Sequence, residues 1–355
     1  MKKYLTLLIM VVLVLGLAAC GSSASNSNNA TPDSSSSNNE PATSEDPIKL
    51  TYAFFAPANT FPAVQMEKWK EELEKRTNGK VQVDLFHGGT LLDAANMYDG
   101  VKNKVADIGL SSTSYEPGRF PLLGISDMPS NYPNAKVASL VVHDLIEKYP
   151  PEAFNDFKII TSFATEPAFV QSQVPVTTID ELKGKQFRIS GALTPIMEEM
   201  GAAPVGISQA ETAEALQTGI IEGYVSSREI LKDLKLAENI KYVTDYTLTI
   251  NTFVAVMNKD TWNSLPEDVQ QVIDELNLEM TQFTGEYLDN HVQDAVKWSE
   301  DEHGLQTVQL TDAPVWDEKL AKIKADYVKQ LVEQGLPAEE YKKTLDELVE
   351  KYSNQ

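Results

Sequence analysis

Short runs in which apolar and polar residues alternate recur from residue 48 onward, separated by longer stretches with helical spacing. The alternating runs predict strands over Ile48–Phe54, Val81–Phe86 and Asp107–Leu110. The stretches between them predict helices over Asn59–Thr77 and about Asp93–Lys104. Strands that alternate with helices in this way form a largely parallel sheet covered by helices on both faces. The folded chain is therefore predicted to begin with an α/β domain.

The same alternation continues through the middle of the chain. A strand over Phe157–Phe163 is expected to lead out of the first domain. The elements expected after it are, in order, helix Ile179–Lys183, strand Gln186–Ser190, helix Thr194–Met200, strand Ala203–Gly206, helix Ser208–Thr218, and strands Ile220–Val225, Tyr242–Thr249 and Thr252–Met257. Ser208 and Glu211 have the spacing of a capping box, which marks the start of their helix.

The last third of the chain has a different, wholly helical pattern. One helix is predicted from Pro266 to about His303, because no proline interrupts this stretch. About 37 residues of helix would be ~55 Å long, which exceeds a single small domain, so we expect this helix to run along two domains. Two further helices are predicted over Pro314–Gln334 and Pro337–Tyr352.

A folded part of about 300 residues normally divides into two domains with separate cores. From the order of the predicted elements, domain I comprises residues 47–164 and 250–295. Domain II comprises residues 165–249 and 296–355 and includes the C-terminal helices.

The N-terminus has the pattern of an export signal. Two lysines precede an apolar run over Leu5–Leu17, which is shorter than the roughly 20 residues of a membrane span. The run ends in Leu17-Ala18-Ala19-Cys20, which resembles the bacterial lipobox, so residues 1–19 are predicted to be a signal peptide and Cys20 to be lipidated. An ordinary signal peptide with a chance cysteine is the alternative. Residues 20–46 are predicted to be a disordered tether, because they hold almost no apolar side chains.

Composition narrows the possible locations and partners. We expect an extracytoplasmic protein held by lipid at the outer face of the cell membrane, and the long polar tether favours a Gram-positive envelope. The formal net charge of −22 argues against nucleic acid and anionic membrane surfaces as partners. Cys20 is the single cysteine, and if it carries lipid no thiol remains, so disulfides, thiol catalysis and cysteine-based metal sites are not expected. The sequence does not decide the oligomeric state, and a monomer is expected.

Motifs typical of catalysis or of cofactor binding are missing from the sequence. The four histidines do not have the spacing of a zinc hydrolase, and there is neither a phosphate-binding loop nor a Gly-x-Ser-x-Gly elbow. We therefore expect no metal, no cofactor and no enzymatic activity.

Several sequence blocks carry a family resemblance. Val105-Ala106-Asp107-Ile108-Gly109 is one, and the most specific is the block from Val176 to Ile189, which reads VTTIDELKGKQFRI. Met200–Val205 and Ala215–Gly223 follow at the expected distance. This series resembles the substrate-binding proteins of tripartite ATP-independent periplasmic (TRAP) transporters, typified by C4-dicarboxylate binders.

The resemblance implies an α/β, two-domain periplasmic-binding-protein-like fold with a hinge and a long helix spanning both domains. It also implies a small organic carboxylate as ligand, bound in the cleft between the domains. TRAP membrane subunits, driven by an ion gradient without ATP hydrolysis, are the implied partners.

Arg188 is the leading candidate for a ligand contact. It stands between Phe187 and Ile189 in a predicted strand, and an arginine within an apolar strand is seldom buried without a partner. Its planar fork can hold a carboxylate through two charge-assisted hydrogen bonds. An internal salt bridge is the alternative from the residues alone. The resemblance implies that Arg188 clamps the ligand carboxylate.

The sequence departs from the family pattern at a second carboxylate contact. The family carries an asparagine after the strand that ends here in Glu222-Gly223-Tyr224-Val225, and this chain has Ser226 at that position. Arg228, two residues later, is a candidate second cation. The alternative is that Arg228 lies on the exposed face of the following helix.

The remaining site candidates follow predicted strands, since ligands of α/β proteins bind where strands end in loops. Ser111, Ser114 and Tyr115 follow one predicted strand, and Phe55 and Asn59 follow the first. Phe163 and Phe169 flank the first crossover between the domains, where aromatic rings either stack on a ligand or pack in the core. The candidate ligand-binding residues are together Arg188, Ser226, Arg228, Ser111, Ser114, Tyr115, Phe55, Asn59, Phe163 and Phe169.

Two alternative functions stay open from the sequence. The chain could serve an ABC importer or a membrane sensor instead of a TRAP system. A surface-anchored hydrolase is the alternative from a different class, and turnover of an ester, glycoside or peptide would identify it.

Overall fold

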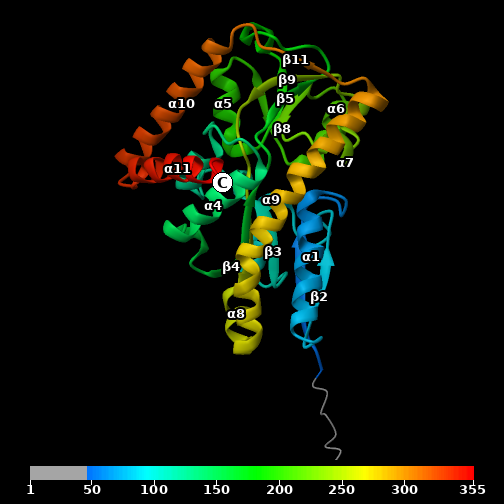
Figure 1. Ribbon diagram of the computed structural model, residues 1–355, viewed down its shortest axis with the longest axis vertical. Coiled ribbons are helices and arrows are strands. Elements are labelled where there is room, and N and C mark those ends of the chain that lie inside the picture. Colours follow the sequence, from blue (N-terminus) through cyan, green and yellow to red (C-terminus); the bar gives the residue numbers. More distant parts are fainter. Residues whose placement is uncertain (1–45) are drawn as a thin grey trace, which may run out of the picture. The chain divides into compact units, whose positions relative to one another are not determined.

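The computed structural model describes residues 46–355. The predicted signal peptide, the lipidated Cys20 and nearly all of the tether lie outside the described residues. Two β-sheets, each with its own helices, form two lobes (Figure 1). The α/β fold with two sheets and a long helix confirms the predicted fold class.

The first lobe is built on a five-stranded sheet of order β2-β1-β3-β10-β4. Its strands are β1 (Ile48–Phe54), β2 (Val81–Phe86), β3 (Ile108–Ser112), β4 (Phe157–Ala164) and β10 (Thr252–Asn258). Its helices are α1 (Phe61–Arg76), α2 (Met97–Lys102), α3 (Pro121–Asp127), α4 (Ala135–Lys148) and α8 (Lys259–Ser264). β1 pairs in parallel with β2 and β3, whereas β10 runs antiparallel to β3 and β4.

The second lobe is built on a six-stranded sheet of order β11-β9-β5-β8-β6-β7. Its strands are β5 (Phe169–Ser172), β6 (Gln186–Ile189), β7 (Ala203–Gly206), β8 (Gly223–Ser226), β9 (Tyr242–Thr247) and β11 (Gln306–Val308). Its short helices are α5 (Thr194–Glu199), α6 (Thr212–Gln217) and α7 (Ile230–Asp233). Apolar clusters cover both faces of this sheet, one under α5 and the other under α6 and α7.

Two crossovers join the lobes. Residues 165–168 lead from β4 to β5, and residues 248–251 lead back from β9 to β10. The crossovers are hydrogen-bonded to each other, for example from the Ala168 amide to the Thr249 carbonyl at 2.6 Å. The second crossover is held to the first lobe by Asp127, whose backbone carbonyl accepts a hydrogen bond from the Ile250 amide at 3.0 Å. Paired crossovers of this kind form a hinge.

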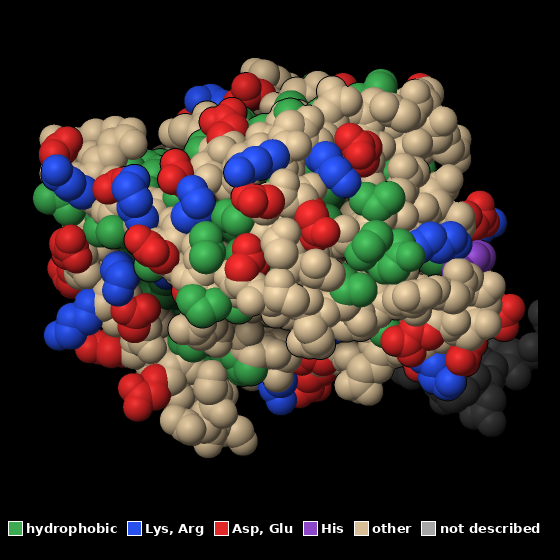
Figure 2. All heavy atoms as spheres, turned by 90° about the horizontal axis from the view of Figure 1, so that it is seen from above, with side chains coloured by type: hydrophobic (Ala, Val, Ile, Leu, Met, Phe, Trp, Pro, Cys, Tyr) green, Lys and Arg blue, Asp and Glu red, His purple; other side chains and the backbone are tan. Residues whose placement is uncertain are grey.

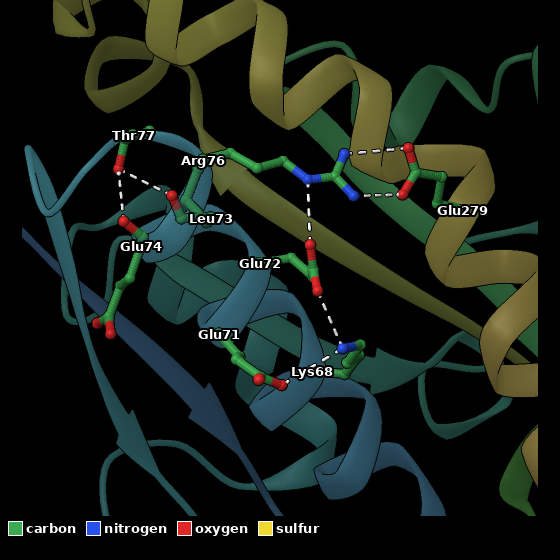
Figure 3. A network of polar contacts seen from close by, with 8 residues as sticks. All are labelled: Lys68, Glu71, Glu72, Leu73, Glu74, Arg76, Thr77 and Glu279. Atoms are coloured by element: carbon green, nitrogen blue, oxygen red, sulfur yellow. Dashed lines mark hydrogen bonds and ion pairs between the residues drawn. The ribbon is translucent and has the colours of Figure 1, made fainter.

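A single helix, α9 (Glu267–His303), spans 37 residues and confirms the predicted long helix. Most of its buried residues pack on the first sheet, and its C-terminal part contacts α7 of the second lobe. Arg76, at the end of α1, binds Glu279 of α9 through two hydrogen bonds of 3.0 and 2.6 Å (Figure 3). A cation is favoured at the C-terminus of α1 by the helix dipole, and here it also fastens α1 to α9.

The two C-terminal helices pack on different parts of the fold. α10 (Ala313–Glu333) buries Trp316 in the second lobe but places Leu331 in the core of the first. α11 (Ala338–Ser353) buries Tyr341 and Leu345 in the first core and packs against α4. The sequence-based division placed residues 296–355 in domain II, whereas α11 packs with the core of the first lobe.

Charged side chains of both signs are mixed over the face seen from above (Figure 2). The negative net charge is therefore not gathered into one acidic patch on that face. In the described part of the chain, no helix is both long and apolar enough to cross a membrane.

Candidate functional site

The carboxyl ends of parallel strands from both sheets border a cavity between the lobes. Its volume is about 690 Å³. The first lobe contributes the loops after β1, β2 and β3, and the second lobe contributes the loops after β6 and β7. The lining residues include Phe55, Tyr115, Pro117, Gly191, Ile207 and Ser208. This is the position at which open α/β sheets bind ligands, and the volume suits a small molecule. We call this cavity the cleft.

Arg188 lies immediately behind the wall of the cleft and is only 1% exposed. Its Nε donates to the Ile207 carbonyl at 3.0 Å, and its Nη2 donates to the Tyr115 hydroxyl at 3.1 Å. No carboxylate within residues 46–355 forms an ion pair with it. The internal salt bridge considered as an alternative is thus not found in this part of the chain. A buried guanidinium without a counter-ion is costly, and an anionic ligand would offset that cost.

The strand register explains why Arg188 is held so firmly. Arg188 on β6 pairs directly with Tyr224 on β8, so both side chains lie on the same face of the sheet. The Tyr224 hydroxyl donates to Gln171 Oε1 at 3.0 Å, and the Gln171 amide donates to the carbonyl of Ser226 at 2.7 Å. Burial raises the pKa of Tyr224, and the nearby positive charge of Arg188 partly opposes this rise. The arginine therefore sits on a rigid polar layer.

Tyr115 brings the first lobe to Arg188. Its hydroxyl accepts one hydrogen bond from Arg188 and another from the Gln209 amide, both at 3.1 Å. Its ring packs edge-on against Phe55, with the centroids 5.1 Å apart. Two of the predicted site residues thus form an aromatic wall of the cleft, beside the predicted arginine.

Arg228 forms a second cluster and already has a partner. Its Nε and its backbone amide donate to Glu166 at 3.1 and 3.0 Å, and its Nη2 binds the same carboxylate. Its guanidinium carbon lies 4.2 Å from the centroid of the Phe169 ring. Arg228 is therefore neither on an open helix face nor an unpaired cation. Ser226, at the family's asparagine position, is buried at the end of β8.

Asn59 makes a different contact between the lobes. Its Nδ2 donates to the Asp233 carbonyl at 2.5 Å, across from the start of α1 to the end of α7. The Asp233 carboxylate in turn lies 2.7 Å from Nε2 of His291 on α9. Asn59 thus helps to join the lobes beside α9.

Three predicted site residues have their partners inside the first lobe or at the hinge. The Ser111 hydroxyl donates to the Ala94 carbonyl, and the Ser114 hydroxyl donates to Asn251 Oδ1 in the second crossover at 2.6 Å. Phe163 is fully buried and stacks on Phe253, with the centroids 5.5 Å apart. Phe163 does not line the cleft; it packs in the core, which was the alternative considered for it.

Sequence reasoning missed several residues of the site. Ile207 and Gln209, which contact Arg188 and Tyr115, follow β7, and the rule that selected the loop after β3 applies to this loop as well. Glu166 carried no signal in the sequence, because its pairing with Arg228 depends on the path of the first crossover. Within residues 46–355 no group of three or more His, Cys, Asp or Glu side chains is placed to hold a metal ion.

Comparison with known proteins agrees with this geometry. Residues 52–330 match the family described as bacterial extracellular solute-binding protein, family 7 (DctP). The ectoine/5-hydroxyectoine-binding periplasmic protein of Ruegeria pomeroyi is 24% identical over 80% of this chain and 86% of its own length.

Two solved structures extend the comparison. A TRAP periplasmic solute-binding protein of Desulfovibrio salexigens is 41% identical, with a TM-score of 0.76, over 86% of this chain and 96% of that chain. A marine metagenome TRAP solute-binding protein specific for aromatic acids, in complex with metahydroxyphenylacetate, is 26% identical, with a TM-score of 0.81, over 86% of this chain and 99% of that chain. The chain therefore belongs to the DctP family of bacterial extracellular solute-binding proteins, the substrate-binding components of TRAP transporters.

Proposed function

We propose that this chain captures a small organic carboxylate outside the cell membrane and delivers it to the membrane subunits of a TRAP importer. The observation that carries the proposal is Arg188, a buried guanidinium beside the cleft without a carboxylate partner in the described part of the chain. Two of its N–H groups are used by Ile207 and Tyr115, and a guanidinium has five. Arg188 therefore keeps donors for a ligand carboxylate.

The cleft favours a ligand with a compact apolar or aromatic body. Phe55 and Tyr115 form one wall, and Ile207 of the second lobe also lines the cleft. The marine metagenome relative is specific for aromatic acids, and the Ruegeria relative binds ectoines, so both bind small ring compounds. Because Glu166 neutralises Arg228, we propose a single carboxylate clamp at Arg188 rather than two.

Three further features complete the proposal. Ligand is bound without chemical turnover, as in a receptor. The protein acts as a monomer, held to the outer face of the membrane through lipid on Cys20, in a Gram-positive envelope. Replacing Cys20 with serine should release the protein from membranes into the medium, as cell fractionation would detect, and continued membrane attachment of C20S would contradict the anchor.

Ligand binding is tested by thermal unfolding of the purified protein with benzoate, 3-hydroxyphenylacetate, succinate and ectoine. A ligand present at 100 times its dissociation constant should stabilise the fold by about 2.7 kcal/mol. We expect stabilisation by at least one of the carboxylates and none by matched alcohols. Stabilisation by the alcohols alone would overturn the carboxylate assignment.

The role of Arg188 is tested by Arg188→Lys, which keeps the positive charge but loses the planar fork. We expect affinity for the stabilising carboxylate to fall by at least about tenfold, since bidentate charged hydrogen bonds are worth more than single ones. Arg228→Lys is the matched control, because Arg228 is already paired with Glu166. Equal effects of the two substitutions would contradict the clamp.

A further inference from the structure

A second cavity, of about 440 Å³, lies beyond the cleft and shares no lining residue with it. The two are separated where Pro117 of the first lobe meets Gly191 of the second. A Cβ built on Gly191 would lie 3.4 Å from Cγ of Pro117, at van der Waals contact, so the two residues lie close together. We call this space the rear cavity.

Three parts of the fold wall the rear cavity. The first lobe contributes the stretch from Thr113 to Met128, the second lobe contributes residues 192–199, and α10 closes the space. Much of the wall is apolar and includes Phe120, Met128, Leu193, Ile196, Ile323 and Tyr327. Such a wall accommodates a small hydrocarbon body.

Carboxylates outnumber cations among the charged residues of this wall. The acidic members are Glu116, Asp127, Glu199 and Asp326, and Lys322 is the only cation among the lining residues. Lys322 is already paired with Asp326 at 2.8 Å. Glu116 and Glu199 pair with Arg119 and Lys319, which do not line the cavity, so Asp127 is the acidic lining residue without an ion pair within residues 46–355.

Two of these carboxyl groups keep a free oxygen in the described structure. Glu116 binds Arg119 through Oε2 at 2.5 Å, and its Oε1 is buried without a hydrogen-bond partner. Asp127 is 2% exposed, and both of its side-chain hydrogen bonds end on Oδ1, so Oδ2 has none. Burial raises the pKa of Glu116, and it raises that of Asp127 to about 7. Each of the two carboxyl groups thus keeps one oxygen that lacks a donor.

We propose that the rear cavity is a second binding site, which takes a small organic ammonium with an apolar body. The ammonium group donates to the free oxygens of Glu116 and Asp127, and the body packs against Ile196, Ile323 and Tyr327. An ammonium carries three donors, and hydrogen bonds between opposite charges are the strongest that such a site can offer. The ligand opposes in charge the carboxylate proposed for the cleft, so the two sites do not compete.

Occupancy of this site is linked to the movement of the lobes. Because both lobes and α10 supply the wall, opening of the hinge changes the shape of the cavity. A ligand that binds one arrangement of the lobes better than another shifts the equilibrium between them. In the same way, a change in the arrangement of the lobes changes the affinity for the ligand.

The test uses benzylamine, with benzyl alcohol as its neutral isostere, on protein whose isoleucine methyl groups are isotopically labelled. Ile196 and Ile323 line the rear cavity and report on binding there by NMR. Benzylamine should shift both methyl signals saturably, and benzyl alcohol should bind about tenfold more weakly. Absence of saturable shifts at these two residues, or equal binding of the alcohol, would overturn the proposal.

Two variants with opposite expected effects sharpen the test. Glu116→Gln removes one acceptor charge and should weaken benzylamine binding by about tenfold, whereas Arg119→Gln frees the Glu116 carboxylate and should strengthen binding. Glu198→Gln is the matched control, since Glu198 is next to Glu199 but does not line the cavity. Unchanged affinity in Glu116→Gln would refute the site, even if the protein still bound a carboxylate in the cleft.

Discussion

The hydroxyl of Tyr115 accepts a hydrogen bond from Nη2 of Arg188 at 3.1 Å, although the two residues belong to different lobes. The same oxygen accepts a hydrogen bond from the Gln209 amide. One phenol group thus links the first lobe to both the arginine clamp and a backbone amide of the second. The ligand contact proposed for Arg188 and the closure of the lobes would therefore share one hydrogen bond.

Tyr115→Phe removes this acceptor and should shift the protein toward an open arrangement. The loss of two hydrogen bonds should also cost about 1–2 kcal/mol of stability. Distances between spin labels on cysteines at the exposed positions Glu71 and Lys183, in a Cys20→Ser background, report on the opening. Tyr149→Phe, whose hydroxyl contacts α11 within the first lobe, is the control and should leave the distances unchanged. An unchanged distance distribution in Tyr115→Phe would contradict the coupling.

Arg228 and Glu166 should behave as a coupled pair. Arg228→Met leaves the buried Glu166 carboxylate with only a backbone donor, so we expect the free energy of unfolding to fall by roughly 2 kcal/mol. This loss is smaller than for a fully buried pair, because Arg228 is partly exposed. Glu166→Gln in the same protein should restore part of the loss, since no charge is then left unpaired. Chemical unfolding of the two single variants and the double variant measures the coupling, and strict additivity would argue against it.

Glu229 should make stability depend on pH. Its side chain is buried, its Oε2 has no partner, and burial together with the charge of Asp233 raises its pKa to about 8. The folded state therefore holds the Glu229 proton to higher pH than the unfolded chain does. The resulting stability is present below about pH 4.5 and is lost as the pH rises through 8.

Glu229→Gln removes this titration but keeps the acceptor for the Ser227 hydroxyl. The variant should match the wild type near pH 5 and exceed it by at least about 1 kcal/mol at pH 8.5. Thermal unfolding at both pH values measures the difference in stability between the variant and the wild type. Titration of Asp127 affects the stability of both proteins equally and therefore cancels. A constant difference across the range would show that Glu229 does not titrate there.

The placement of α11 predicts where a C-terminal substitution acts. Tyr341→Ala should destabilise the first lobe by about 3–5 kcal/mol, because it empties a fully buried site and removes the hydrogen bond to Ser126. Hydrogen exchange should accelerate in α4, not in β6 or β8. Leu320→Ala on α10 is the counterpart, and its effect should fall on the second sheet. Exchange that accelerated first in the second sheet of Tyr341→Ala would contradict the placement.

The strongest local patterns predicted their elements closely. Strands β1 and β2 begin and end at the predicted residues, since their alternation is regular and polar turns follow them. The strand predicted at Ile220 begins only at Gly223, because the amides of Ile220 and Ile221 bond to Ala215 and close the turn after α6. Apolar character alone therefore misplaced that boundary.

The site was predictable where a residue conflicted with its surroundings. An arginine between two apolar strand residues indicated Arg188, and the structure buries this side chain beside the cleft. The partners of Arg228 and Ser114 were not predictable, because Glu166 and Asn251 lie in crossovers whose positions depend on the whole fold. Sequence patterns set local structure, whereas such long-range pairs follow from topology.

The shared helix α9 has a consequence for how the protein unfolds. Its buried residues belong mainly to the first core, while its C-terminal turns contact α7 of the second lobe. If either lobe unfolds, the part of α9 that packs on it is exposed. Because the other lobe packs on the same helix, it is destabilised as well. Melting should therefore be cooperative across the hinge, and scanning calorimetry should record one heat-absorption peak rather than two.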